Sequence, residues 1–184
     1  MKSLKEFIDD IEKKEGSAAL AANETIALFK QRVSQFYEHI EQDWLKELIE
    51  TGKIVCAKRE ISVTEESLGT YPIDEMTLTF GRFVIRLTPI GTILIGSPGR
   101  IDMTYEGKSR MFVLIDKRIT NASQQIVIKE YIGTEPVDKE KKAKAKPMSK
   151  PEYVWKFVDD LRLYTYSIVD RQSFQDLIVK LING

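Results

Sequence analysis

Residues 99–118 have the sequence GRIDMTYEGKSRMFVLIDKR, and this stretch decides the fold class. Residues 101–105 alternate between apolar and polar side chains, which is typical of a strand with one buried face. The polar residues 106–109 predict a turn. Residues 111–115 are apolar without interruption, which predicts a central strand covered on both faces. So short a connection predicts antiparallel pairing, because parallel strands need a long crossover.

Similar strand patterns lie on both sides of this stretch. The further predicted strands cover residues 54–57 continuing to 61–63, residues 76–80 continuing to 83–87, residues 92–95 and residues 125–132. Short turns connect most of them. The sequence therefore predicts an antiparallel meander sheet of about five to seven strands.

Helical periodicity dominates the N-terminal end of the chain. Ser3 and Glu6 form a capping box that predicts the start of a first helix, and Gly16 predicts its end. A second helix is predicted over residues 23–51, with Asn23 as its N-cap. This second helix is long enough to protrude from a small domain or to serve in a dimer.

Helical signals return near the C-terminal end. Ser149 and Glu152 form another capping box, with Pro151 in the first turn, and apolar residues follow at helical spacing. Asp170 is the predicted N-cap of a last helix. The expected fold is therefore α+β, with helices at both ends of the sheet.

The length of the chain suits one domain. We expect a single α+β domain over residues 1–184, made of four parts. These are a helical N-terminal segment (1–52), the antiparallel sheet (53–133), a lysine-rich linker (134–148) and C-terminal helices (149–184).

Composition makes several classes of protein unlikely. Lys+Arg and Asp+Glu number 28 each, so the strong basic excess of a dedicated nucleic-acid binder is absent. No apolar stretch approaches the length of a membrane span, and the N-terminus lacks a signal-peptide pattern, so we expect a cytoplasmic protein. Cys56 is the only cysteine and His39 the only histidine, which excludes an internal disulfide and a four-ligand Cys/His zinc site. His39 reads as a surface or boundary residue and Cys56 as a small buried strand residue, each without a catalytic role.

One polar pattern in the 99–118 stretch invites a catalytic hypothesis. Asp102 opens the first strand, and Asp116 and Lys117 close the second. This arrangement resembles the PD-(D/E)xK family of metal-dependent nucleases. The resemblance implies that Asp102 and Asp116 bind Mg²⁺ and that Lys117 helps to orient the attacking water. The family places its lysine two residues after the second acid, whereas Lys117 follows Asp116 directly.

Hairpin geometry bears on this resemblance. If residues 107–108 form a two-residue turn, Asp102 lies opposite Val113. Side chains alternate along a strand, so Lys117 then shares the face of Asp102 while Asp116 points to the other face. A bulge or a three-residue loop would reverse this. The alternative reading is two solvated carboxylates at strand ends.

Other residues are candidates for binding. Trp155 lies away from the apolar face of the helix predicted there, and with Tyr164 and Tyr166 it is a candidate interface anchor; core packing is the alternative. Lys141 and Lys142 are candidate contacts for an acidic surface, with a solvated linker as the alternative.

These observations favour a non-catalytic protein-binding module of the cytoplasm, of the adaptor or immunity type. Its contacts, with a protein partner or a second copy, are expected through residues 23–51 or 149–184. A metal-dependent nuclease and an oligomeric structural component are the alternatives.

Overall fold

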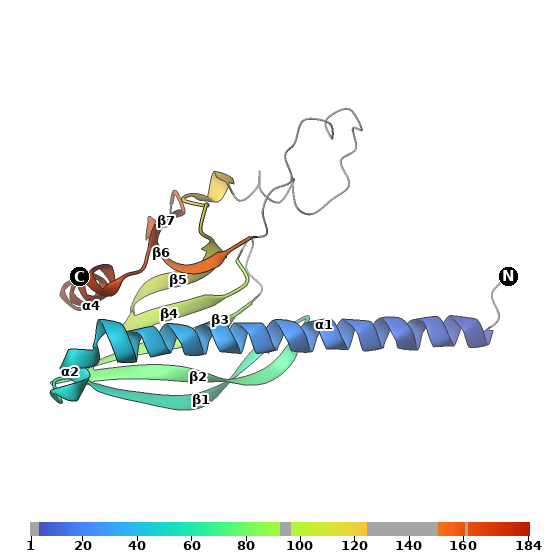
Figure 1. The fold of residues 1–184 in the computed structure, drawn as a ribbon, viewed down its shortest axis with the longest axis horizontal. Coiled ribbons are helices and arrows are strands. Elements are labelled where there is room, and N and C mark those ends of the chain that lie inside the picture. The colour runs from blue at the N-terminus through green and yellow to red at the C-terminus, as the bar shows by residue number, and fades with distance from the viewer. Residues whose placement is uncertain (1–3, 93–96, 125–150, 161) are drawn as a thin grey trace.

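A computed structural model of the chain describes residues 4–92, 97–124, 151–160 and 162–184. It contains an N-terminal helical arm, one antiparallel sheet of seven strands and a C-terminal helix, which confirms the α+β class and the meander (Figure 1). The helical elements are α1 (Leu4–His39), η1 (Ile40–Trp44), α2 (Lys46–Glu50) and α4 (Arg171–Asn183). The strands are β1 (Val55–Glu65), β2 (Gly69–Phe80), β3 (Phe83–Gly91), β4 (Arg100–Tyr105), β5 (Lys108–Asp116), β6 (Tyr153–Asp160) and β7 (Thr165–Ile168).

Each strand pairs with the next strand in the chain, in the order β1-β2-β3-β4-β5-β6-β7, and all pairings are antiparallel. The β4–β5 turn consists of Glu106 and Gly107, both with positive φ (44° and 79°). Such a turn matches the right-handed twist of a hairpin. The predicted register was wrong by two residues, because Asp102 lies opposite Met111 and not opposite Val113.

The two predicted N-terminal helices are one helix. Gly16 lies inside α1 and does not end it. A single glycine costs a helix only about 1 kcal/mol relative to alanine, and the alanine-rich residues 18–22 that follow are strong helix formers. The helix changes character at Ile40, where η1 forms one π-helical turn.

The helix predicted from Ser149 is wrong, because Tyr153–Asp160 forms strand β6. Apolar residues in this segment fit both helical spacing and a strand with both faces covered, so periodicity alone does not separate the two. Aromatic and β-branched side chains favour the strand, and pairing with β5 and β7 on both sides stabilises it. The predicted strand 125–132 and the predicted linker 134–148 lie outside the described residues.

The main core lies between the sheet and the helices that cover one of its faces. Phe36 of α1 is at its centre, with ring centroids 5.6 Å from Trp44 of η1, 5.4 Å from Phe112 of β5 and 6.4 Å from Phe174 of α4. This one side chain therefore joins the contiguous elements α1 and η1 to β5 and α4, which are far away in the sequence.

The π-helical turn is held by α4. A π-helix shifts the backbone hydrogen bonds, and two carbonyl groups at η1 accept from side chains of the C-terminal helix. Gln175 donates to the carbonyl of Trp44 at 2.8 Å, and Arg171 donates to the carbonyl of Asp43 at 2.6 Å. Asp170 caps α4 through a reciprocal hydrogen-bond pair with Ser173, as its sequence predicts.

A smaller apolar cluster, which includes Val113 and Ile115, lies on the other face of β5 to β7. Lys156 is 1% exposed beside it, and its ammonium group donates to the carbonyls of Lys117 (2.9 Å) and Ile119 (2.6 Å). Burial lowers the pKa of Lys156. The lysine thus ties the chain that leaves β5 back to the sheet.

Candidate functional site

The structure separates the residues of the predicted metal site. Asp102 receives a bidentate pair of hydrogen bonds from Arg100, at 2.6 and 2.7 Å. Asp116 accepts from the guanidinium and the backbone amide of Arg118. Lys117 forms an ion pair with Glu152. Each charged group therefore has its own local partner.

The two carboxylates also point to opposite faces of the sheet. Ile101 and Met103 pack in the main core beneath α1, so the side chain of Asp102 between them points away from that core. Asp116 has the same alternation as Phe112, which packs in the main core. Hydrogen bonds from Arg118 lower the pKa of Asp116. Among the described residues, no group of three or more His, Cys, Asp or Glu side chains gathers as a metal site.

The predicted aromatic anchors have three different environments. Trp155 is half-buried against α1, where its indole donates to the carbonyl of Arg32 at 3.2 Å. Tyr166 is 9% exposed and packs in the smaller cluster. Tyr164 is 46% exposed, in the connection between β6 and β7. Of the three, Tyr164 has the accessibility that a contact residue needs. Lys141 and Lys142 lie outside the described residues.

His39 and Cys56 take structural positions near η1. The exposed imidazole of His39 stacks on Trp44, with ring centroids 6.1 Å apart. Cys56 hydrogen-bonds Glu41 at 3.5 Å, and burial together with this carboxylate raises the pKa of the thiol to about 12. A thiol with so high a pKa forms little thiolate at neutral pH and is a poor nucleophile.

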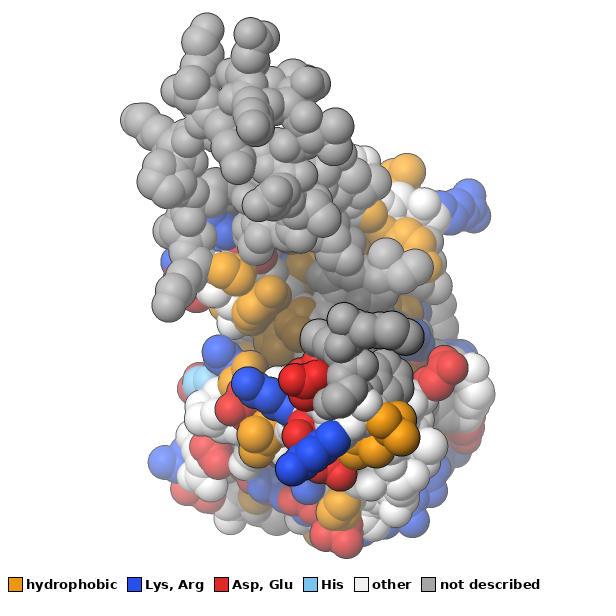
Figure 2. Space-filling view, turned by 90° about the vertical axis from the view of Figure 1, so that its right-hand side faces the viewer, with side chains coloured by type: hydrophobic (Ala, Val, Ile, Leu, Met, Phe, Trp, Pro, Cys, Tyr) orange, Lys and Arg blue, Asp and Glu red, His pale blue; other side chains and the backbone are white. Residues whose placement is uncertain are grey.

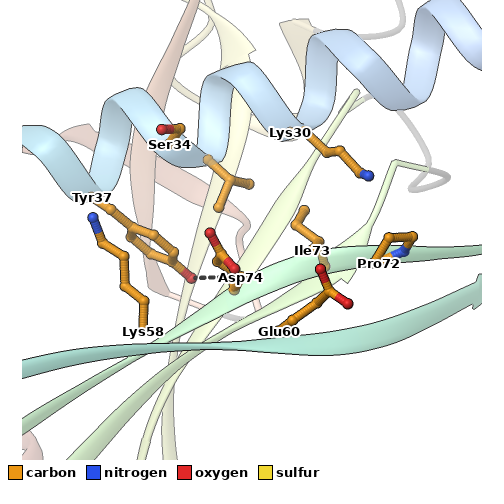
Figure 3. A pocket seen from close by; sticks show the side chains of 9 residues that line it. Lys30, Ser34, Tyr37, Lys58, Glu60, Pro72, Ile73 and Asp74 are labelled. Atoms are coloured by element: carbon orange, nitrogen blue, oxygen red, sulfur yellow. Dashed lines mark hydrogen bonds between the residues drawn. The ribbon is translucent and has the colours of Figure 1, made fainter.

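A groove of about 240 Å³ lies between α1 and strands β1 and β2 (Figure 3). Figure 3 shows Lys30 on the helix side, Lys58 and Glu60 on β1, and Asp74 on β2. The groove is smaller than the roughly 300–1,000 Å³ that is usual for small-molecule sites. Its charges of both signs suit polar side chains of a protein partner as well as a small ligand.

Tyr37 of α1 lines this groove, and its hydroxyl reaches into the sheet. Tyr37 is 1% exposed and its hydroxyl donates to the carbonyl of Leu87 at 2.8 Å, with the carbonyl of Asp74 at 3.2 Å. The backbone amide of Met76 hydrogen-bonds the same hydroxyl. Met76 and Leu87 are cross-strand partners, so the hydroxyl takes part in the ladder between β2 and β3. Burial raises the pKa of Tyr37 far above its usual value.

The largest unpacked feature is the N-terminal half of α1. We call residues 4–21 the projecting segment, because they extend past the edge of the sheet with nothing described beside them (Figure 1). Every described side chain in the projecting segment is exposed, including Leu4 (74%), Ile8 (45%) and Ile11 (39%). Figure 2 looks onto this end of the molecule and shows hydrophobic side chains among charged ones.

Sequence reasoning missed this segment because it ended the first helix at Gly16. The angular positions of the apolar residues around the helix could have revealed it. Leu4, Ile11 and Ala18 lie within about 20° of the direction of Phe29 when 3.6 residues make one turn. Ile8 has the same relation to Val33. The apolar stripe that packs on the sheet therefore continues, in phase, beyond the sheet.

Comparisons with known proteins give no relative for this chain: no family model, no curated protein and no solved structure matches it. None of the helices in the described ranges is long and apolar enough to cross a membrane.

Proposed function

We propose that this chain is a non-catalytic protein-binding module of the cytoplasm, of the adaptor or immunity type, and that the projecting segment of α1 is its contact surface. The observation that carries the proposal is the continuation of the core stripe of α1 past the edge of the sheet, with Leu4, Ile8 and Ile11 exposed. Apolar side chains grouped on one side of an unpacked helix are typical of a site that another protein covers.

The stability of an unsupported helix adds to this proposal. Most helical stability in proteins comes from packing of the apolar face and not from helix propensity. The projecting segment is about 27 Å long at 1.5 Å per residue, and it receives no such packing from the described part of the chain. A partner that covers the stripe supplies the missing packing.

The polar residues of the chain favour binding over catalysis. Asp102, Asp116 and Lys117 are each held in a separate ion pair. Cys56 has a raised pKa. These side chains are engaged in holding the fold, whereas the projecting segment contributes nothing to the core and is available for contact.

A photo-crosslinking experiment tests the proposal. The photoreactive residue p-benzoylphenylalanine replaces Ile11 on the stripe or, as a matched control, Lys13 on the opposite side of the same helix. We expect a discrete protein adduct from position 11 in cells and little or none from position 13. Equal adducts from both positions, or none from either, would contradict the proposal.

A further inference from the structure

We infer that the protein covering the projecting segment is a second copy of this chain, packed antiparallel so that the partner's Ala18 lies against Leu4 and the partner's Ile11 against Ile11. This inference rests on the proposed function. It adds the identity of the partner and the orientation of the two helices.

No described residue lies against the stripe in the projecting segment, so a partner helix can pack there. The stripe points to the side of α1 on which the sheet lies, and beyond the sheet edge that layer holds nothing described. Packed helix axes lie about 8–10 Å apart. Packed layers of a protein lie at a similar spacing of about 10 Å. A partner helix therefore continues the layer of the sheet along α1.

The position of the sheet decides the orientation. In a parallel pair the stripes of the two helices face each other along their whole length. Both sheets, each packed on the stripe near Phe29 and Phe36, would then occupy the same space between the helices. In an antiparallel pair the two sheets lie at opposite ends of the helix pair. Only the antiparallel arrangement is free of this clash.

Side-chain size along the stripe agrees with the antiparallel arrangement. The large residues Leu4, Ile8 and Ile11 are near the N-terminus, and the small Ala18 is near the sheet. Antiparallel packing opposes large to small at both ends of the contact, with Ile11 near the two-fold axis. The helices then keep an even separation, as close packing requires.

Charges on one flank of the stripe are also complementary. Asp10 and Lys14 lie one turn apart on the same flank. A two-fold axis across the helix pair brings identical flanks together, so Lys14 lies within about two residues of the level of the partner's Asp10. Asp10 lies equally near the partner's Asp10, so each pair of flanks has two attractive contacts and one repulsive contact. The opposite flank brings Glu12 near its own copy, and Glu15 lies on the stripe itself. These carboxylates weaken the pair, so we expect a dimer that dissociates on dilution.

Sedimentation velocity of the full chain over a dilution series tests self-association. We expect a reversible monomer–dimer equilibrium. Ile11→Lys raises the dissociation constant on the order of tenfold or more, because it places a charge in the contact. Leu20→Lys is the matched control, since Leu20 is 67% exposed and lies about 180° from Phe29 around the helix. We expect no change for the control, and tighter association for Glu15→Leu.

Disulfide crosslinking tests the orientation. In a Cys56→Ala background, Leu4→Cys mixed with Ala18→Cys is expected to form a mixed disulfide dimer. Leu4→Cys alone is expected to form little, because the antiparallel arrangement holds the two copies of that position far apart. Efficient crosslinking of Leu4→Cys with itself would overturn the antiparallel arrangement.

The outcomes separate this inference from the proposed function. A monomer at every concentration, together with an adduct from position 11 to a different protein, overturns the self-pairing and leaves the protein-binding function standing. A monomer with no adduct from position 11 overturns both. An adduct of twice the mass of the chain supports both.

Discussion

Tyr37→Phe tests how α1 is fastened to the sheet. The substitution keeps the ring and removes a hydroxyl that donates to the carbonyl of Leu87 at 2.8 Å and interacts with the backbone amide of Met76. Both backbone groups belong to paired strands, so the hydroxyl is part of the β2–β3 ladder.

The expected loss of stability follows from the number of buried groups affected. A net hydrogen bond contributes about 1 kcal/mol, and a buried backbone group left without a partner costs about 1–3 kcal/mol. Small shifts of β2 and β3 can restore hydrogen bonds to some of these backbone groups, so we expect the free energy of unfolding to fall by about 2 kcal/mol. In a domain of this size each kcal/mol lowers the Tm by about 2–4 °C, which predicts a shift of about 4–8 °C.

Urea unfolding measures this loss, with tryptophan fluorescence and circular dichroism as independent probes. Trp44 and Trp155 both pack against Phe36, so their fluorescence reports the core beside α1. Tyr164→Phe is the matched control and is expected to change stability by less than about 0.5 kcal/mol, because this residue is 46% exposed. If Tyr37→Phe is as stable as the control, the hydroxyl does not hold the junction and the reasoning fails.

Three further predictions concern the sheet. Gly99→Ala is expected to cost about 1–3 kcal/mol in urea unfolding, since its Cβ would lie 2.8 Å from a ring carbon of Phe29; unchanged stability would contradict this close contact. Asp116→Asn is expected to destabilise the protein at neutral pH. The folded-state pKa of Asp116 is lowered by Arg118, so its contribution is present above about pH 4 and is lost as the pH falls through the folded pKa. The difference from wild type should therefore narrow in acid, and a constant difference would argue against the ion pair. Cys56 should react slowly with iodoacetamide at pH 8 and quickly after unfolding, because its pKa is raised to about 12; equally rapid labelling of the folded protein would contradict this.

The predicted hairpin of residues 99–118 had the wrong register but the correct faces for its two carboxylates. The turn was placed one residue too late, which moved Asp102 from Met111 to Val113 in the predicted register. The error is two residues, which is the period of a strand. The prediction that Asp102 and Asp116 point to opposite faces therefore agrees with the structure.

The segment Tyr153–Asp160 shows the opposite case. Ser149, Pro151 and Glu152 are good helix-start residues, and the apolar residues after them have helical spacing. Pairing of β6 with two neighbouring strands outweighs these local preferences, which are worth only fractions of a kcal/mol each. Trp155, which a helix would have turned away from the core, instead packs on Phe36.

The local sequence determined that residues 55–116 form an antiparallel meander, because strand alternation and turn residues act between neighbours in the chain. It also determined the cap of α4 at Asp170. The predicted continuation of residues 76–80 into 83–87 was wrong, because a turn at residues 81–82 separates β2 from β3 and the two strands pair with each other. Only the tertiary structure decided that α1 continues through Gly16. It also decided that the apolar stripe of α1 extends past the edge of the sheet in the projecting segment. Whether a stripe is covered depends on where the sheet ends in space, and helical periodicity carries no information about that edge.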